Sequence, residues 1–187
     1  MTESDERATV RPVTLARLVE TAHVCSMEFR STADIEERLD VTHRRARETL
    51  LEALRIDLIE EDASHEEPMY ETTHIGEEFL SAVQSEDWQA VSDILATRSP
   101  HYGAFLEVLA STAPADLKAL LEALEGAEEH SPRSYNQTSV EVIGDWAERL
   151  GTIQRNAFTG KYYPRERDSV PANFPHALLG IYDDLEE

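Results

Sequence analysis

The chain has 187 residues, 41% of them hydrophobic, which is enough to bury the core of one domain or of two small ones. Its formal net charge is -21, and it has neither an apolar run of about 18 residues nor a basic-then-apolar start, so we expect no membrane span, no signal peptide and a cytoplasmic protein. A single cysteine, Cys25, excludes an internal disulfide, and the seven histidines are too scattered to predict a zinc site or a cofactor.

Two helices are predicted after an N-terminal tail over 1–12. Apolar residues at helical spacing over 13–26, which include Leu15, Leu18, Val19 and Ala22, indicate an amphipathic helix. Ser31, followed three residues later by Asp34, is typical of a helix start, and it predicts a short helix that buries Ile35 and Leu39.

A turn at Asp40-Val41 leads into a third predicted helix. Thr42 is placed to cap it, and the helix continues to about Arg55 with a buried stripe of Ala46, Leu50 and Leu54. At 100° per residue this stripe turns Arg45 outward with Glu52 and leaves Arg47 close to the core side.

A hairpin is predicted next, with strands at 58–60 and 69–71 on either side of the polar run EDASHEEP. The segment that follows carries Thr73, Gly76 and Phe79 in the spacing T-x-x-G-x-x-F. Helix, short helix, turn, longer helix, hairpin and this step together resemble the winged-helix superfamily. The resemblance covers residues 13–83, with Thr72 standing where a leucine is expected.

The second half of the chain reads as helices followed by another hairpin. Three amphipathic helices are expected from Asp87-Trp88, Ser99-Pro100 and Ala113-Pro114, and a fourth from Thr138 or Ser139 to Leu150 with a cap at Gly151. The run TIQRNAFTGKYYP then predicts two strands around a turn at Thr159-Gly160, and a last helix is expected over 175–187. A helix that ends in R-L-G before a hairpin resembles the end of a second winged-helix unit.

These elements predict a mainly α fold with small β-hairpin wings, in which two winged helix-turn-helix copies are joined by a helical segment. The expected boundaries are 13–83 for the first unit, 84–125 for a helical linker, and 126–187 for the second unit with its C-terminal helix. The apolar stripes of 87–125 exceed what two small cores bury, so we expect this segment to form a homodimer interface.

Acidic residues outnumber basic ones by 38 to 17, and only Lys118 and Lys161 are lysine. Dispersed acids with almost no lysine resemble the proteins of salt-in halophiles, in which net charge maintains solubility. The alternative is an acidic protein that avoids or mimics nucleic acid.

Against this background, the stretch THRRARE gathers three arginines within four positions. In winged-helix proteins that bind DNA, the start of the third helix enters the major groove, where arginine matches guanine and phosphate. The resemblance therefore implies DNA contact at this helix start, by the residues Thr42, His43, Arg44, Arg45 and Arg47. The alternative is that Arg44 and Arg45 pair with Glu48, and Arg55 with Glu52, across helical turns.

The two hairpins differ in charge. The first carries five carboxylates in EEDASHEEP and should be repelled by phosphate, which we interpret as a solvated acidic loop. The stretch 149–165 has no Asp or Glu and interleaves cations with Phe158 and Tyr163. We expect it to contact the DNA backbone through Arg155, Lys161, Tyr162 and Arg165. The alternative is that its strands are buried, which also excludes acids.

The sequence therefore predicts a DNA-binding transcriptional regulator of a halophilic microbe, with double-stranded DNA as its partner. A tandem winged-helix module that binds protein, like condensin- or polymerase-associated subunits, is the alternative, and the acidic first wing favours it. No glycine-rich phosphate loop and no nucleophile-base pattern indicates an enzyme.

Overall fold

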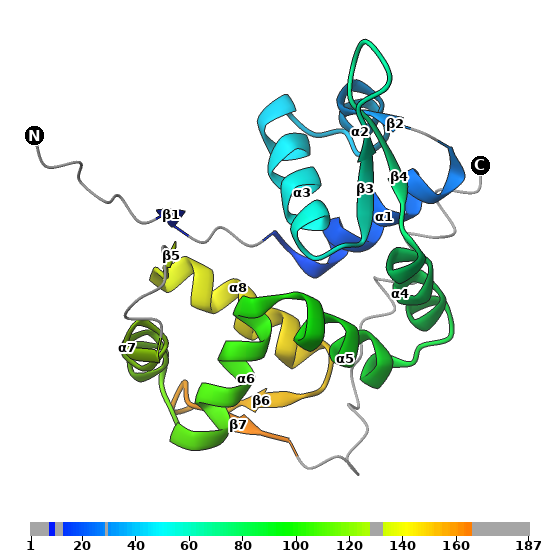
Figure 1. Cartoon of the computed structure of the whole chain (residues 1–187). Coiled ribbons are helices and arrows are strands. Elements are labelled where there is room, and N and C mark those ends of the chain that lie inside the picture. The colour runs from blue at the N-terminus through cyan, green and yellow to red at the C-terminus, as the bar shows by residue number, and fades with distance from the viewer. Residues whose placement is uncertain (1–7, 10–12, 29, 128–132, 166–187) are drawn as a thin grey trace, which may run out of the picture. The chain divides into compact units, whose positions relative to one another are not determined.

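The computed structural model describes residues 8–9, 13–28, 30–127 and 133–165 (Figure 1). The described residues fall into two compact units. The N-terminal unit comprises residues 13–28 and 30–99, and the C-terminal unit comprises 8–9, 100–127 and 133–165. Both units are mainly helical with small β-sheets, as the sequence predicts. The helix expected over 175–187 lies outside the described residues.

The N-terminal unit begins with three helices and a short strand and continues with a hairpin and two further helices. Its elements are α1 (Leu15–Met27), β2 (Arg30–Ser31), α2 (Thr32–Arg38), α3 (His43–Arg55), β3 (Ile59–Asp62), β4 (Met69–Thr72), α4 (His74–Gln84) and α5 (Trp88–Arg98). The three strands form an antiparallel sheet in the order β2-β4-β3. This order and pairing are consistent with a winged helix, and the loop between β3 and β4 stands where the sequence predicts a wing (Figure 1).

The first two helices follow the sequence prediction, except that Leu39, expected to be buried on the second helix, is its half-buried C-cap. Leu15, Leu18, Val19 and Ala22 are all buried on α1. A capping box confirms the predicted start of α2, because the Ser31 hydroxyl accepts from the Asp34 backbone N–H and the Asp34 carboxylate accepts from the Ser31 backbone N–H. Strand β2 ends at Ser31, the first residue of this box, and was not predicted, since two residues are too short to show a strand pattern.

The T-x-x-G step joins the hairpin to α4. Thr73 is the N-cap, and its hydroxyl accepts from the Gly76 backbone N–H at 3.0 Å. Gly76 packs closely on the backbone of Leu58, between α3 and β3. A Cβ added at Gly76 would lie 2.0 Å from the Leu58 carbonyl oxygen. Thr72, at the position where a leucine is expected, donates its hydroxyl to the Ala22 carbonyl at 2.9 Å and so ties β4 to α1.

The C-terminal unit repeats the order of helices and hairpin. Its elements are β1 (Ala8–Thr9), α6 (Pro100–Thr112), α7 (Leu117–Ala127), β5 (Arg133–Ser134), α8 (Gln137–Arg149), β6 (Ile153–Arg155) and β7 (Tyr162–Pro164). Strands β1 and β5 pair in parallel, and β6 and β7 form an antiparallel hairpin. The core is aromatic: Tyr102 packs on Trp146, and Phe105 meets the Tyr162 ring edge to face.

Two predicted helix starts in this unit are wrong. Helix α8 is capped by Asn136, in a box with Ser139, rather than by Thr138 or Ser139. Helix α7 begins at Leu117 rather than at Pro114, because Ala115 is occupied in backbone pairing with Tyr162 and Asp116 accepts from the Ala119 N–H. The predicted end of α8 is confirmed, since Gly151 follows the helix with a φ of 70°.

Residues 84–125 do not form a separate helical segment. Helix α5 packs on α4 in the N-terminal unit, whereas α6 and α7 pack with α8 in the C-terminal unit. The apolar stripes that suggested a dimer interface are buried inside these units, as Val91, Leu95, Phe105 and Leu120 illustrate. Burial within the chain therefore removes the reason for which the sequence predicts a dimer.

The helix before the hairpin and the hairpin itself share one pattern of backbone hydrogen bonds in the two units. In the N-terminal unit, the Leu58 N–H donates to Ala53 and its carbonyl accepts from Thr73. The C-terminal unit repeats both bonds, with Thr152 donating to Ala147 and accepting from Arg165.

The strand before the second helix is also repeated, in reduced form. Arg30 pairs with Tyr70 in the N-terminal unit, and Ala115 forms a single bridge with Tyr162 in the C-terminal unit. In both cases the pairing is antiparallel, and the next residue starts the N-terminal turn of the second helix.

No helix among the described residues is long and apolar enough to cross a membrane.

Candidate nucleic-acid interface

The start of α3 exposes the polar side chains that the resemblance implies as DNA contacts. Thr42 is the N-cap by backbone geometry, although its side chain makes no capping hydrogen bond. Thr42, His43, Arg44 and Arg45 are all exposed. The His43 ring bonds to the Glu36 carboxylate on α2, which holds the first turn of α3 against the preceding helix.

The four arginines of α3 differ in their partners. Arg44 pairs with Glu48 at 3.2 Å, and Arg55 pairs with Glu52 at 2.7 Å, as the salt-bridge alternative predicts. Arg45 and Arg47 have no recorded ion pair within the described part of the chain. Exposed guanidinium groups without a carboxylate partner remain available to phosphate and to base edges.

The orientation predicted for α3 is wrong by part of a turn. Its buried residues are Ala46, Thr49, Leu50, Glu52 and Ala53 rather than a stripe that ends at Leu54. The rotation turns Arg47 outward and Glu52 inward, and leaves Leu51 55% exposed. The ion pair with Arg55 stabilises the buried carboxylate of Glu52. A charged residue therefore occupies a buried position where the helical periodicity predicts an apolar one.

The first wing is acidic and exposed. Glu60, Glu61, Glu66 and Glu67 all face solvent, and Asp62 is half-buried at the end of β3. Hydrogen bonds from the Ser64 side chain and backbone hold the pKa of the Asp62 carboxyl below its ordinary value, which keeps it charged. This hairpin therefore offers negative charge in the same unit as the arginines of α3.

The second hairpin separates its predicted contact residues. Arg155 is exposed, and Lys161 and Arg165 are half-buried. Tyr162 is only 3% exposed, so its ring is core and not a surface for DNA, as the burial alternative predicts for this residue. The Arg155 guanidinium lies 5.5 Å from the centre of the Tyr162 ring. Burial raises the pKa of the Tyr162 hydroxyl, and the Arg155 charge opposes that shift.

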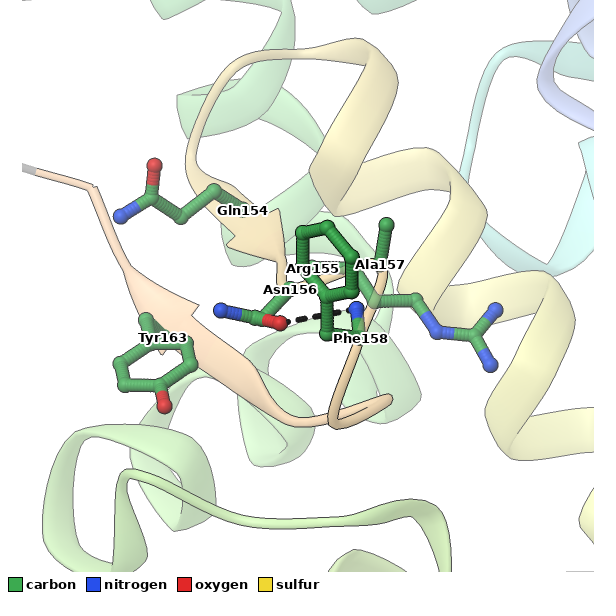
Figure 2. Close-up of a pocket in the computed structure, with 6 residues that line it drawn as sticks. All are labelled: Gln154, Arg155, Asn156, Ala157, Phe158 and Tyr163. Carbon is green, nitrogen blue, oxygen red and sulfur yellow. Dashed lines mark hydrogen bonds between the residues drawn. The ribbon is translucent and has the colours of Figure 1, made fainter.

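A hollow on this hairpin contains residues that were not predicted as a site. Its walls are Gln154, Arg155, Asn156, Ala157, Phe158 and Tyr163 (Figure 2). Phe158 is 100% exposed, the most exposed large apolar side chain among the described residues. The alternation of aromatics with cations in 149–165 indicates a binding surface on this hairpin. No pattern in the sequence indicates that the amides of Gln154 and Asn156 belong to it.

Helix α8, which occupies in its unit the place of α3, has the opposite charge. Its surface carries Glu141, Asp145 and Glu148, and Arg149 is paired with Asp145 at 2.7 Å. These carboxylates would repel phosphate, so a groove-reading role is unfavourable for α8. Nor do the described residues hold any group of three His, Cys, Asp or Glu side chains that could bind a metal.

Comparison with known proteins adds little. No protein-family model and no curated protein matches the chain. The crystal structure of T. acidophilum IdeR is similar with a TM-score of 0.27 and 18% sequence identity, over 88% of this chain and 66% of that chain. The chain thus spans about two thirds of the length of that protein, and a TM-score this low assigns neither fold nor function.

Proposed function

We propose that the protein is a cytoplasmic DNA-binding transcriptional regulator whose α3 reads duplex DNA. The observation that carries the proposal is the exposed, unpaired state of Arg45 and Arg47 on the third helix of a unit consistent with a winged helix. In a chain with a formal net charge of -21, carboxylates are abundant enough to neutralise every arginine. Leaving two guanidinium groups unpaired on one short helix favours an anionic partner.

The proposal includes a second winged-helix copy in the C-terminal unit. The shared hydrogen bonds around Leu58 and Thr152, and the shared bridges to Tyr70 and Tyr162, support this relation. In this copy the hairpin, with Arg155 and Lys161, contacts the DNA backbone in place of the acidic helix α8. The excess acid elsewhere then serves solubility in concentrated salt.

A homodimer is kept in the proposal on a functional ground alone, since a dimer would double the phosphate contacts and could read a two-fold site. Sedimentation in concentrated potassium chloride measures it directly, and a species of 21.1 kDa at all micromolar concentrations would remove the dimer from the proposal.

The first test is binding of the full chain to native genomic fragments, followed by fluorescence anisotropy in molar potassium chloride. Counterion release contributes little at that salt, so specific base contacts survive while non-specific binding fades. We expect Arg45→Ala with Arg47→Ala to weaken binding of the best fragment by about 1 to 3 kcal/mol for each base that the arginines read.

Arg17→Ala with Arg38→Ala is the matched control, because it removes the same charge from α1 and α2 of the same unit. Thermal melting checks that both variants fold. Equal affinity of the α3 variant and the wild type would show that α3 is not the reader.

A protein-binding module is the second candidate, favoured by the acidic wing of the N-terminal unit and the acidic face of α8. If the wild type binds no fragment in any salt, this second candidate replaces the regulator.

A further inference from the structure

The outer face of the β6–β7 hairpin carries an aromatic and amide surface that phosphate contact does not explain. Gln154 and Tyr163 are cross-strand partners, so their side chains lie on the same face. Together with Asn156 and Phe158 they border a hollow of about 510 Å³. Figure 2 shows Gln154 and Tyr163 extending to one side of the hairpin and the Arg155 guanidinium extending to the other.

The turn that presents Phe158 is fixed by its own hydrogen bonds. The Asn156 side-chain oxygen accepts from the backbone N–H of Phe158 at 2.9 Å and of Thr159 at 3.0 Å. Gly160 closes the turn with a φ of +67°. Both bonds use the amide oxygen of Asn156, which leaves its NH₂ group as a donor at the hollow.

A fully exposed phenylalanine gains no free energy from burial within its own unit. An ordered turn that holds it in water favours a partner with a flat apolar face. Tyr163 supplies a second, half-buried ring. The Gln154 amide has no hydrogen bond recorded within the described residues, so it can offer a donor and an acceptor to the edge of a planar ligand.

Charge decides the class of ligand. The stretch 149–165 contains no Asp or Glu, and Arg155 and Lys161 lie at the two ends of the turn that holds Phe158. A planar ligand with hydrogen-bonding edges on an anionic backbone is a nucleotide. Bases inside a duplex hide their faces by stacking, so only an unpaired base can place a face against Phe158.

We infer that this hollow binds an unpaired base of a nucleic-acid strand, stacked on Phe158 and Tyr163 and contacted at its edge by Gln154 and Asn156. The inference deepens the proposed function and rests on it, since it adds a single-stranded contact on the hairpin already assigned to the DNA backbone. It predicts that the protein recognises DNA in which at least one base is unstacked beside the duplex site.

The experiment uses the full chain, a single-stranded oligonucleotide containing 2-aminopurine, the same sequence as a duplex, and free adenosine monophosphate. Stacking on an aromatic ring quenches 2-aminopurine fluorescence, so the probe reports the contact itself. We expect quenching by the wild type, and about tenfold weaker single-strand binding with no quenching by Phe158→Ala. Phe158→Tyr keeps the ring and should restore both signals.

Met27→Ala is the matched control, because Met27 is another exposed large apolar side chain among the described residues and lies at the end of α1, on neither α3 nor the hairpin. It should leave single-strand binding unchanged. Wild-type behaviour of Phe158→Ala on the single strand, with duplex binding intact, would overturn this inference and leave the regulator standing. If the wild type binds neither the single strand nor the duplex, both this inference and the proposed regulator fail. Tight binding of adenosine monophosphate would make the ligand a free nucleotide and overturn the strand contact.

Discussion

The two units place opposite charges on the same backbone arrangement. In the N-terminal unit the exposed face of α3 is basic and the β3–β4 wing is acidic. In the C-terminal unit the exposed face of α8 is acidic and the β6–β7 hairpin has cations and no carboxylate. The hydrogen bonds that join helix to hairpin are nevertheless the same in both.

The difference shows that similar helix–hairpin hydrogen bonding can carry opposite surface charge. A winged helix that holds DNA with both helix and wing needs positive charge on both, because each approaches phosphate. Here each unit provides one positive element. On our proposal each unit contributes its own positive element to DNA binding, and charge reversal in the hairpin tests that division.

The largest expected effect is the loss of DNA affinity when the charges of the β6–β7 hairpin are reversed. The double variant Arg155→Glu and Lys161→Glu removes two phosphate contacts and adds two repulsive charges. DNA affinity should therefore fall by about 100-fold or more. The slope of log affinity against log salt should decrease by about 2, since each contact contributes about 0.9. Anisotropy titrations at several potassium chloride concentrations measure both quantities.

The matched control is Lys118→Glu with Arg98→Glu, which makes the same change in net charge outside α3 and the hairpin. Both side chains are exposed and already paired, Lys118 with Glu122 and Arg98 with Asp57. If this control loses as much affinity as the hairpin variant, net charge rather than the hairpin governs binding, and the division between the two units fails.

Much of the fold could be predicted because strong local signals agreed with it. Helical periodicity located α1, the Ser31–Asp34 spacing located α2, and the Thr73–Gly76 step located the end of the first hairpin. The signal was weak where the structure depends on contacts distant in sequence. A two-residue strand such as β2, or the single bridge at Ala115, exists only through its partner strand.

The site was less predictable than the fold for two physical reasons. Helical periodicity fixes a helix orientation only when buried positions are apolar, and the buried Glu52 on α3 broke that rule and misplaced Arg47. On the hairpin, adjacent tyrosines have opposite environments because side chains alternate along a strand. Only the pairing register reveals that Tyr162 faces the core while Tyr163 faces the hollow.

A second prediction compares the glycines that face each hairpin. In Gly76→Ala the new Cβ would lie 2.0 Å from the Leu58 carbonyl oxygen, and backbone cannot yield as a side chain can. We expect a loss of about 3 kcal/mol in the free energy of unfolding. In Gly144→Ala the nearest atom is Cε1 of the Tyr162 ring at 3.3 Å, which can shift slightly.

The alanine at 144 also gains about 1 kcal/mol of helix propensity, so the change there should be close to zero. Gly126→Ala, with no atom within 4 Å of the added Cβ, is the reference for propensity alone. Urea unfolding of the three variants measures the differences. Similar losses at 76 and 144 would mean that both hairpins are anchored to their helices in the same way.

The smallest expected effect is a pH-dependent change in the free energy of unfolding, which should occur for the charged capping box of α2 and not for the neutral box of α8. In the box of α2, hydrogen bonds from the backbone and side chain of Ser31 lower the pKa of the Asp34 carboxyl below its ordinary value of 3.8. Because the folded pKa lies below the unfolded one, the carboxylate stabilises the fold above pH 3.8, and that contribution is lost as pH falls through the folded pKa. Asp34→Asn should therefore cost about 0.5 kcal/mol near neutral pH.

That cost should shrink toward zero as pH falls below 3.8, where the wild-type carboxyl also becomes neutral. The box of α8 is the control, since Asn136 and Ser139 do not titrate. Ser139→Ala should cost about 1 kcal/mol at every pH, because it removes a cap hydrogen bond without any change of charge. Urea titrations from pH 7 down to about 3 compare the two boxes, and a pH-independent cost for Asp34→Asn would show that the box acts through shape and hydrogen bonding alone.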